Sequence, residues 1–495
     1  MHEIHPPSAA EYIRFLPEII LTIVGVLVMV LEAVTNERQK RSLGFLALAG
    51  VLASMLAAAY AYGSAGQAFQ NMITVDGYGT FFIELVLAIG CLTLLASFAY
   101  LKREGAESGE FYSLILFSLV GQCILATAND LIMVFIGLEV SSIATYILAG
   151  YLRDDRRNNE SALKYFLLGS FATAFMLYGI AWVYGLIHST NLDEIRRVLA
   201  EPHSQQGLSM VLVGVAAALI FVGLAFKVSA APFQSWAPDV YQGAAAPVSA
   251  FMSAAPKAAA FAVFFRVFIT AFGPINERWE PLVWACALLT MFIGNFAALT
   301  QTNVKRLLGY SSIAHAGYVL VALTAYSTLG ISAAMFYLAS YALMNVGAFA
   351  VVSRVASRHE KYVHISDLAG LARREPATAA LLTVFVLSLI GVPLTGGFFA
   401  KFYVFRAALD SHLIWLTILG LLNSAVAAYY YLKILVAVYM QEPGEATNNL
   451  QPFAPGLRFT IWAAALGTLV LGIFPSTLLT FVSSSAAEVT KALTP

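Results

Sequence analysis

The chain has 495 residues, of which 60% are hydrophobic and only 11% are charged. A soluble core of this size could not bury so much apolar surface, so the composition predicts a protein that spans a lipid bilayer. Its 28 basic residues balance 28 acidic residues, which argues against a nucleic-acid partner. The three cysteines, Cys91, Cys123 and Cys286, lie far apart and fit no pattern of a disulfide framework, a zinc site or an iron–sulfur cluster.

Fourteen apolar runs predict an all-α membrane protein with about fourteen transmembrane helices, since a spanning helix needs about 20 mostly apolar residues. The runs lie at 15–35, 42–63, 76–100, 111–128, 131–151, 162–187, 208–231, 247–272, 280–300, 306–326, 330–353, 377–407, 411–440 and 458–482. The N-terminal segment MHEIHPPSAAEYIRF lacks the basic start and the small-residue cleavage site of a secretory signal. We therefore expect the first run to remain as a membrane helix.

Basic residues in the loops predict how the helices are oriented, because cytoplasmic loops carry an excess of Lys and Arg. If the first loop, NERQKRS, is cytoplasmic, seventeen basic residues fall in cytoplasmic loops and five on the opposite side. This asymmetry, with an even number of helices, places both termini on the outer side. The six basic residues that fall inside predicted helices are Lys227, Lys257, Arg266, Lys401, Arg406 and Lys433.

A short internal repeat relates two parts of the chain. The tetrapeptide SSIA occurs twice, starting at Ser141 and at Ser311. Lys227 follows the start of the first copy by 86 residues, and Lys401 follows the second by 90. Glycine and proline interrupt both lysine-containing runs, in FKVSAAPFQSWAP and GVPLTGGFFAK. Such breaks at matching places are typical of discontinuous helices around a transport site, so we expect helices 7 and 12 to be discontinuous.

The two copies of this pattern lie five helices apart, so they should have opposite topology. We therefore expect two inverted five-helix repeats, made of helices 4–8 and 9–13. The predicted regions are 1–110 with helices 1–3, 111–272 with the first repeat, 273–440 with the second repeat, and 441–495 with a loop and helix 14.

Three ionisable residues lie deep enough in their predicted helices to suggest a role in moving protons. Glu139 is near the middle of helix 5, where a carboxylate costs several kcal/mol unless it is paired or protonated. Lys257 lies about ten residues inside helix 8 and cannot reach the membrane surface, and a buried amine can take up and release a proton. Lys227 is nearer the end of its run, where reaching the interface is an alternative. For Glu139 the alternative is a neutral side chain hydrogen-bonded to Ser141 or Ser142.

Other ionisable residues in the helices are weaker candidates. His315 lies in the first half of helix 10, where a packed imidazole and a proton relay are the two alternatives. Lys433 and Glu84 have a similar depth, and a relay role is less favoured for both. The residues near helix ends, which we expect at the membrane interface, are Glu32, Arg266 and Arg406.

Three segments carry a resemblance to a known family: FKVSAAPFQSWAPDVYQGAAAPVSAFMSAAPKAAAF, LLGYSSIAHAGY and GVPLTGGFFAKFYVF. On these segments, and on the helix pattern from end to end, the chain resembles the antiporter-like membrane subunits of respiratory complex I, most closely the subunit N family of NADH-quinone oxidoreductase. The sister subunit M has Glu where this chain has Lys401, and subunit L continues into a long lateral helix, so both differences favour N. If position 401 needs only a titratable group, we expect Glu to serve there.

The resemblance implies a role for each candidate residue. Glu139 and Lys227 would form the input ion pair. Lys257 would be the central proton carrier, His315 would link the two halves of the chain, and Lys401 would be the terminal carrier.

The resemblance also implies that the chain is one subunit of an enzyme complex, a proton-translocating NADH:quinone oxidoreductase, in a bacterial inner membrane. The redox chemistry of NADH, FMN, iron–sulfur clusters and quinone would belong to partner subunits, with no cofactor in this chain. The expected partners are the lipid bilayer and neighbouring membrane subunits such as M, K and J, and both termini would lie on the periplasmic side. The alternative functions are a cation/proton antiporter subunit of the Mrp type and a membrane scaffold that pumps nothing.

Overall fold

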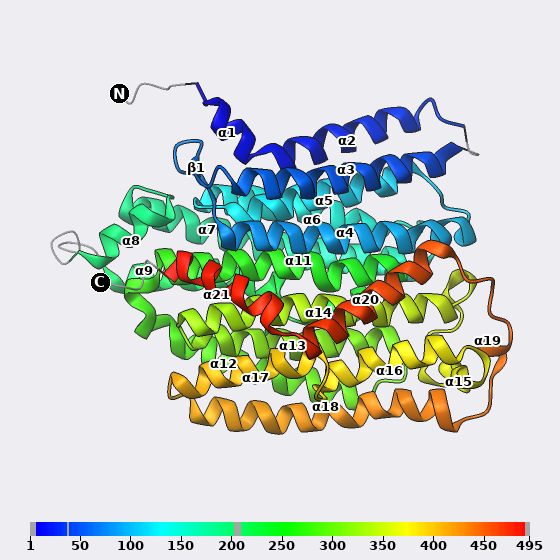
Figure 1. The fold of residues 1–495 in the computed structure, drawn as a ribbon. Helices are drawn as coiled ribbons and strands as arrows, with labels where there is room; N and C mark the ends of the chain where they lie inside the picture. The colour runs from blue at the N-terminus through cyan, green and yellow to red at the C-terminus, as the bar shows by residue number, and fades with distance from the viewer. Residues whose placement is uncertain (1–5, 37–38, 202–208, 491–495) are drawn as a thin grey trace.

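The computed structural model describes residues 6–36, 39–201 and 209–490. Figure 1 shows long helices lying side by side, with their axes running from one end of the molecule to the other. In the described residues twelve helices are long and apolar enough to cross a membrane. The only sheet in this part of the chain is a short antiparallel hairpin of β1 (Gly66–Ala68) and β2 (Ile73–Val75), which was not predicted. The prediction of an all-α membrane protein is confirmed.

The first helices account for predicted helices 1–3. They are α1 (Ala9–Arg14), α2 (Leu16–Glu32), α3 (Lys40–Tyr62) and α4 (Gly77–Glu104). The local sequence sets both ends of α4. Asp76 precedes the helix, and its carboxylate accepts a hydrogen bond from the N–H of Gly79 at 2.6 Å. Gly105 follows the helix with a φ of +68°, the left-handed conformation that often ends a helix.

The next group corresponds to predicted helices 4–8, and its fourth member is interrupted. The members are α5 (Gly109–Thr127), α6 (Leu131–Ala149), α7 (Arg156–Ile187), α9 (Met210–Lys227) followed by α10 (Trp236–Gly243), and α11 (Ala246–Arg266) with the π-helical turn η2 (Val267–Ala271). A short amphipathic helix, α8 (Leu192–Ala200), lies between α7 and α9 and buries Leu192, Ile195 and Leu199 on one face.

The following group corresponds to predicted helices 9–13, and its fourth member is again interrupted. The members are α12 (Asn276–Leu299) preceded by η3 (Gly273–Ile275), α13 (Val304–Thr324), α14 (Thr328–Val355), α16 (Pro376–Ile390) followed by α17 (Gly396–Asp410), and α18 (Ile414–Met440). The short connecting elements are η4 (Arg358–Glu360), η5 (Ile365–Leu368), α15 (Leu371–Arg374) and α19 (Glu445–Asn448). The shared order of continuous and interrupted helices agrees with two five-helix repeats. The four residue regions drawn from the sequence remain a prediction.

Helix 14 differs from its prediction. The single run at 458–482 corresponds to two helices, α20 (Pro455–Ile473) and α21 (Ser476–Thr490). Pro475 lies between them, and proline lacks the N–H that would continue a helix. Two further crossings add to the twelve: α2 has 17 residues, and α16 has 15 residues and is continued by α17. The described part of the chain thus has a helix, continuous or interrupted, for each of the fourteen predicted runs.

Both helix interruptions have a local cause. In the first, α9 ends at Lys227 and Ser229 has a φ of +62°. Trp236 of α10 donates its indole N–H to the carbonyl of Phe226 at 3.0 Å, which satisfies an acceptor left free by the end of α9. In the second, Gly391 has a φ of +96°, and a Cβ there would lie 3.1 Å from Cδ of Lys401. Glycine is therefore required by the backbone and by the close approach of the lysine.

The helices that carry the central candidates lie in the middle of the bundle. The apolar stretch of α11 is 100% buried and those of α13 and α14 are 94% buried, against 39% for α7 and α18. Figure 1 places α11, α13 and α14 between the N-terminal helices α2 and α3 and the late helix α18. Polar side chains on the three central helices are therefore shielded from lipid and from water.

The two ends of the bundle differ. The helix α1 and the last turns of α21 lie at one end, with α8 and the hairpin, and α15 and α19 lie at the opposite end (Figure 1). Segments that the sequence shows to be rich in basic residues meet at this opposite end, which we call the basic end. There Arg157 donates to the carbonyl of His359 at 2.9 Å, and the N–H of His359 donates to Glu104 at 2.9 Å. Arg38 and Lys491, which the orientation count includes, lie outside the described residues.

Candidate functional site

Lys227 ends α9 inside the bundle, where only 3% of its surface is exposed. Its ammonium donates to Oγ of Ser142 at 2.9 Å and to the hydroxyl of Tyr165 at 3.0 Å. It also lies 5.2 Å from the ring centre of Tyr165 and 5.7 Å from that of Tyr146, and ring faces attract cations. The alternative in which Lys227 reaches the membrane interface is wrong.

Glu139 on α6 does not form the expected ion pair in this structure. Within the described residues, Glu139 and Lys227 make no ion pair at 4.0 Å or less. Ser142, three residues further along α6, accepts from Lys227 instead, and Oε1 of Glu139 is buried without a hydrogen-bond partner in the described part of the chain. Residues three apart are neighbours on a helix surface, so Glu139 lies beside the residue that accepts from Lys227.

Lys257 lies in the middle of α11, with 2% of its surface exposed. Its ammonium donates to Oγ of Ser312 at 2.6 Å and to the backbone carbonyl of the same residue at 3.0 Å. Pro256 precedes it inside a continuous helix. Both acceptors carry no formal charge, and they can accept from a neutral amine as well as from an ammonium.

His315 lies one turn after Ser312 on α13 and connects three helices. Its Nδ1 is 2.7 Å from the hydroxyl of Tyr337 on α14, and its Nε2 is 3.3 Å from the hydroxyl of Tyr431 on α18. Tyr431 also contacts Oγ of Ser311. An imidazole between two hydroxyl groups can accept at one nitrogen and donate from the other, which is what a proton relay requires.

Lys401 lies on α17 and points into the break between α16 and α17. Its ammonium donates to the carbonyls of Leu389 and Ile390 at 3.1 Å and 2.8 Å, and to Oγ of Ser424 at 2.7 Å. The two carbonyls are free because α16 stops there, and the C-terminal end of a helix carries partial negative charge. The break thus creates a site for a cation inside the bundle.

Polar side chains lie between the region around His315 and the region around Lys401. The Lys401 ammonium is 5.0 Å from the ring centre of Tyr318. The hydroxyl of Tyr318 accepts from Nδ2 of Asn295 at 3.2 Å, and Oδ1 of Asn295 accepts from Tyr430 at 3.0 Å. The ring centre of His315 lies 5.8 Å from that of Tyr318. Structural contacts therefore bring Lys257, His315 and Lys401 into one polar region.

The remaining candidates lie apart from this region. Lys433 donates to the carbonyl of Leu299 at 3.2 Å, and its ammonium lies 5.0 Å from the ring centre of Tyr429. Arg266 was expected near a helix end, and it is the last residue of α11. Only 4% of it is exposed, and it donates to both carboxylate oxygens of Asp76, which precedes α4, at 2.8 Å and 2.9 Å. Glu32 pairs with Lys40 at 3.0 Å near the end of α2.

Comparisons with known proteins decide the family. The family model described as NADH:quinone oxidoreductase/Mrp antiporter, TM, matches residues 128–427. A protein named NADH-quinone oxidoreductase subunit N 1, from Solibacter usitatus (strain Ellin6076), is 62% identical over 478 residues, which are 97% of this chain and 98% of that protein. The chain belongs to the subunit N family of NADH-quinone oxidoreductase.

Solved structures agree with membership of the subunit N family. A chain of respiratory complex I from Thermus thermophilus with bound aureothin matches with a TM-score of 0.80 and 35% identity, covering 94% of this chain and 98% of that chain. A chain of the Mrp complex from Dietzia sp. DQ12-45-1b matches with a TM-score of 0.83 and 20% identity, covering 98% and 100% of the two chains. The second match shows a shared fold.

Most of the site residues that the sequence did not identify in this subunit N family chain are hydrogen-bond partners of the lysines. The repeated SSIA contained a usable signal, because its second serine accepts from a buried lysine in both copies: Ser142 from Lys227, and Ser312 from Lys257. Tyr431 is different, since nothing in the sequence distinguishes it from the other tyrosines among the 23 in the chain.

Proposed function

We propose that this subunit N family member moves protons across a bacterial inner membrane as part of an NADH-quinone oxidoreductase. The observation that carries the proposal is the set of acceptors around three buried lysines. Lys227, Lys257 and Lys401 donate to hydroxyl and backbone carbonyl oxygens in the described structure. Unlike a carboxylate, these acceptors carry no formal charge, and they can accept from a neutral amine as well as from an ammonium. Each lysine is therefore able to give up a proton and take it back.

Other buried cations of the bundle have carboxylate partners and provide the contrast. Arg266 pairs with Asp76 at 2.8 Å, and Lys305 pairs with Glu360 at 2.5 Å. An opposite charge at this distance favours the charged form of both partners, so a proton reaches such a carboxylate only at the expense of the ion pair. The distinction supports a carrier role for the three lysines and not for Arg266.

The proposed path runs laterally through the middle of the bundle. A proton released by Lys257 enters the hydroxyl and imidazole groups of Ser312, His315 and Tyr431, and it leaves at the Lys401 ammonium site beside Tyr318. Lys227 and Glu139 supply charge at the start of the path. When their pair opens or closes, the field at Lys257 changes, and in a low-dielectric interior such a change reaches the order of kcal/mol.

Partner subunits complete this proposal. Moving one charge against 100 mV costs about 2.3 kcal/mol, and the energy would come from NADH oxidation and quinone reduction at FMN, iron–sulfur clusters and quinone held by other subunits. Membrane subunits such as M, K and J would be neighbours in the bilayer. The basic end would face the cytoplasm and both termini the periplasm, following the excess of Lys and Arg in its loops.

The test uses inside-out membrane vesicles that carry the whole complex. NADH oxidation is expected to drive proton uptake, and a double variant, Lys257→Ala with Lys401→Ala, is expected to lose this uptake while NADH oxidation with an artificial electron acceptor continues. An unchanged number of protons per NADH in the double variant would identify a scaffold that pumps nothing. Sodium/proton exchange that persists without NADH oxidation would identify an antiporter.

Glu139→Gln and Lys227→Ala are each expected to reduce NADH-driven proton uptake, with the double variant little worse than either. The carboxylate and the amine would act as a unit, so removing the second partner costs little once the first is gone. Ser142→Ala, which removes the neutral acceptor of Lys227, is expected to retain most of the uptake because it favours the closed pair. The coupling energy from the three rates is the measurement, and strictly additive losses would contradict the ion-pair role.

A further inference from the structure

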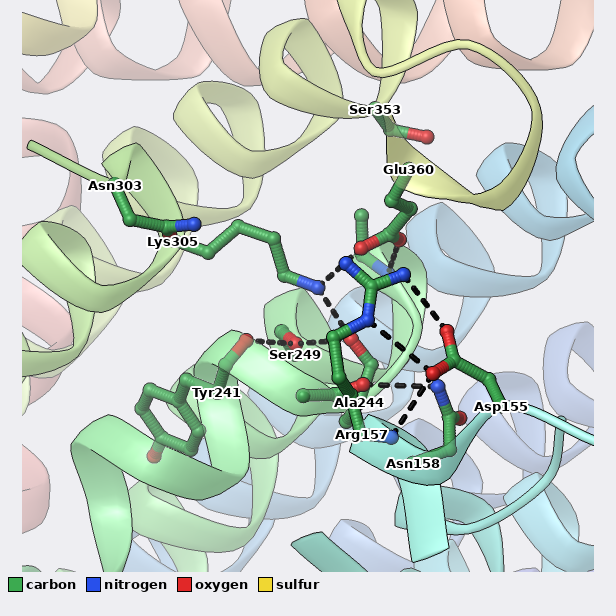
Figure 2. A network of polar contacts seen from close by, with 12 residues as sticks. Asp155, Arg157, Asn158, Tyr241, Ala244, Ser249, Asn303, Lys305, Ser353 and Glu360 are labelled. Carbon is green, nitrogen blue, oxygen red and sulfur yellow. Dashed lines mark hydrogen bonds and ion pairs between the residues drawn. The ribbon is translucent and has the colours of Figure 1, made fainter. Parts of the chain in front are cut away.

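The carboxylate of Glu360 joins three helices at the basic end (Figure 2). Its Oε2 accepts from Nζ of Lys305 on α13 at 2.5 Å. Its Oε1 accepts from the hydroxyl of Tyr100 on α4 at 2.9 Å and from the N–H of Ala246, the first residue of α11, at 2.6 Å. Lys305 also donates to the carbonyl of Ala244. Lys305 is one of the seventeen basic residues counted in loops, since the predicted run began at 306. That placement is wrong, because Lys305 lies in the first turn of α13 and is 0% exposed.

The backbone around Glu360 is strained. Ser357, His359 and Glu360 have φ values of 59°, 56° and 50°, in the left-handed region that residues other than glycine rarely adopt. Arg157 and Glu104 hold this loop through hydrogen bonds of 2.9 Å to the backbone of His359. Strain of this kind persists only where the surroundings enforce it, and it clusters at functional sites.

Polar groups lead from Glu360 into the bundle along α11. Three polar residues of α11 follow its first residue at intervals of three or four: Ser249, Ser253 and Lys257. That spacing puts them on one face of the helix, and the eleven steps from Ala246 to Lys257 span about 16 Å at 1.5 Å per residue. Oγ of Ser253 accepts from Nδ2 of Asn345 at 2.6 Å, and Oδ1 of Asn345 is buried without a partner in the described residues.

The outer side of the same loop borders a cleft. The cleft has a volume of about 1110 Å³, and its lining includes Glu104, Asp155, Arg157 and His359. Arg157 and Asp155 form an ion pair at 2.8 Å, and Figure 2 shows this pair beside Glu360. Glu360 thus lies between a charged cleft on the outside and a line of hydroxyl groups on the inside.

We propose that Glu360, with Lys305, is the entry pair through which protons from the basic end reach Lys257; this rests on the proposed function. A proton from the cleft converts the Glu360 carboxylate to a carboxylic acid, which loosens its hold on Lys305. The ammonium of Lys305 keeps its bond to Ala244. The acid then gives its proton to the hydroxyl groups of α11. In this structure Ser249 donates to the carbonyls of Tyr241 and Ala244, and Ser253 donates to that of Ala250, so each hydroxyl turns away from its carbonyl to accept one proton and pass one on. The neutral amine of Lys257 becomes an ammonium, and the carboxylate pairs with Lys305 again.

The pH dependence of this entry step belongs to a cluster and not to Glu360 alone. The titratable and charged groups that face Glu360 or its loop are Tyr100, Arg103 and Glu104 of α4, Asp155 and Arg157 at the start of α7, Lys305 of α13, and His359 next to it. Lys305 is the direct counter-ion, and Arg157 is already paired with Asp155.

The test separates an entry pair from a structural ion pair by removing both charges at once. Removing one charge leaves the other buried and unpaired, which is strongly destabilising, whereas replacing both with neutral side chains of similar volume is often neutral. The double variant Glu360→Gln with Lys305→Met is therefore expected to assemble in the whole complex, since Gln keeps an acceptor for the N–H of Ala246. Its proton uptake per NADH oxidised is expected to fall on the order of tenfold or more, while NADH oxidation by an artificial acceptor is unchanged.

The matched control is Lys361→Gln, the next residue in the chain. Lys361 pairs with Glu445 at 3.2 Å, and both side chains are more than half exposed, at 61% and 65%. An exposed pair contributes little, so this variant is expected to pump like the wild type. Wild-type uptake in the Glu360/Lys305 double variant would overturn the entry role and leave a structural ion pair.

A second comparison covers the case in which the double variant does not assemble. Glu360→Asp and Glu360→Gln are then compared at equal amounts of assembled complex; more uptake with Asp supports the entry role, and equal uptake overturns it. Lys257→Ala, measured alongside, keeps the two proposals apart. Uptake that survives the loss of Lys257 contradicts the proposed function, whereas uptake that is lost with Lys257 but not with Glu360 contradicts only the entry role.

Discussion

Lys257→Ala is expected to abolish NADH-driven proton uptake by inside-out vesicles while the complex stays assembled. The ammonium has one described partner residue, Ser312, whose hydroxyl and carbonyl both accept from it. Because neither group is charged, removing the amine leaves no buried charge unpaired, and the damage to folding is a cavity worth a few kcal/mol. Loss of the carrier should slow proton transfer by roughly a hundredfold or more. The measurement is the rate of proton uptake at a matched rate of NADH oxidation.

Lys257→Arg separates positive charge from proton transfer. Arginine keeps the cation but stays protonated in proteins, so this variant is expected to be as inactive as Lys257→Ala. Lys361→Gln, with its exposed side chain, again serves as the control for handling and assembly. Proton uptake that survives in Lys257→Arg would show that a fixed positive charge is sufficient, and it would remove Lys257 from the proton path.

Lys401→Glu is expected to lose at least as much proton uptake as Lys401→Ala at mildly alkaline pH, which reverses the expectation drawn from the sister subunit M. The Lys401 ammonium is surrounded by acceptors, the carbonyls of Leu389 and Ile390 at 3.1 Å and 2.8 Å and the hydroxyl of Ser424 at 2.7 Å. An ionised carboxylate there would face the negative end of α16. The two carbonyls would also lose their donor, at a cost of about 1–3 kcal/mol each.

The pH dependence of the Lys401→Glu variant checks this reasoning. A protonated glutamic acid can donate to one of the two carbonyls. The proton uptake of the Lys401→Glu variant, relative to that of Lys401→Ala, is therefore expected to rise as the pH falls, and this gain is expected to disappear as the pH rises. Arg406→Gln is the matched control on the same helix, because Arg406 is exposed and its ion pair with Asp410 is long, at 3.9 Å. A glutamate variant that pumps better than the alanine variant in alkaline medium would show that a titratable group of either sign is enough.

Most of the fold could be predicted because its signals are local. The run at 330–353 lies within α14 (Thr328–Val355), and the breaks in helices 7 and 12 follow from proline and glycine in the runs themselves. The break between α20 and α21 was missed even though Pro475 is visible in the sequence, because the apolar composition continues across it. The hairpin of β1 and β2 was missed because two strands of three residues are too short for a periodic pattern.

The candidate site was predicted less completely. Depth along a helix depends only on the rise per residue, and it identified Lys257. The repeat and the helix breaks identified Lys227 and Lys401. All three lysines are at least nine-tenths buried. Lys305 was counted in a loop because the predicted run began at 306, whereas it is the second residue of α13. Its complete burial comes from Glu360, 55 residues away, on a loop that packs over the end of the helix.

The sequence by itself determined where the helices run, where two of them break, and which lysines lie deep in the bundle. Apolar run length, proline geometry and helical rise all act between neighbouring residues, so they can be evaluated from a short window of the chain. Only the tertiary structure decided which atoms receive each cation. Ser142 is 85 residues from Lys227, and Asp76 is 190 residues from Arg266. These contacts depend on the order of the helices and on the rotation of each about its own axis, which the packing of the whole bundle sets and no local pattern encodes.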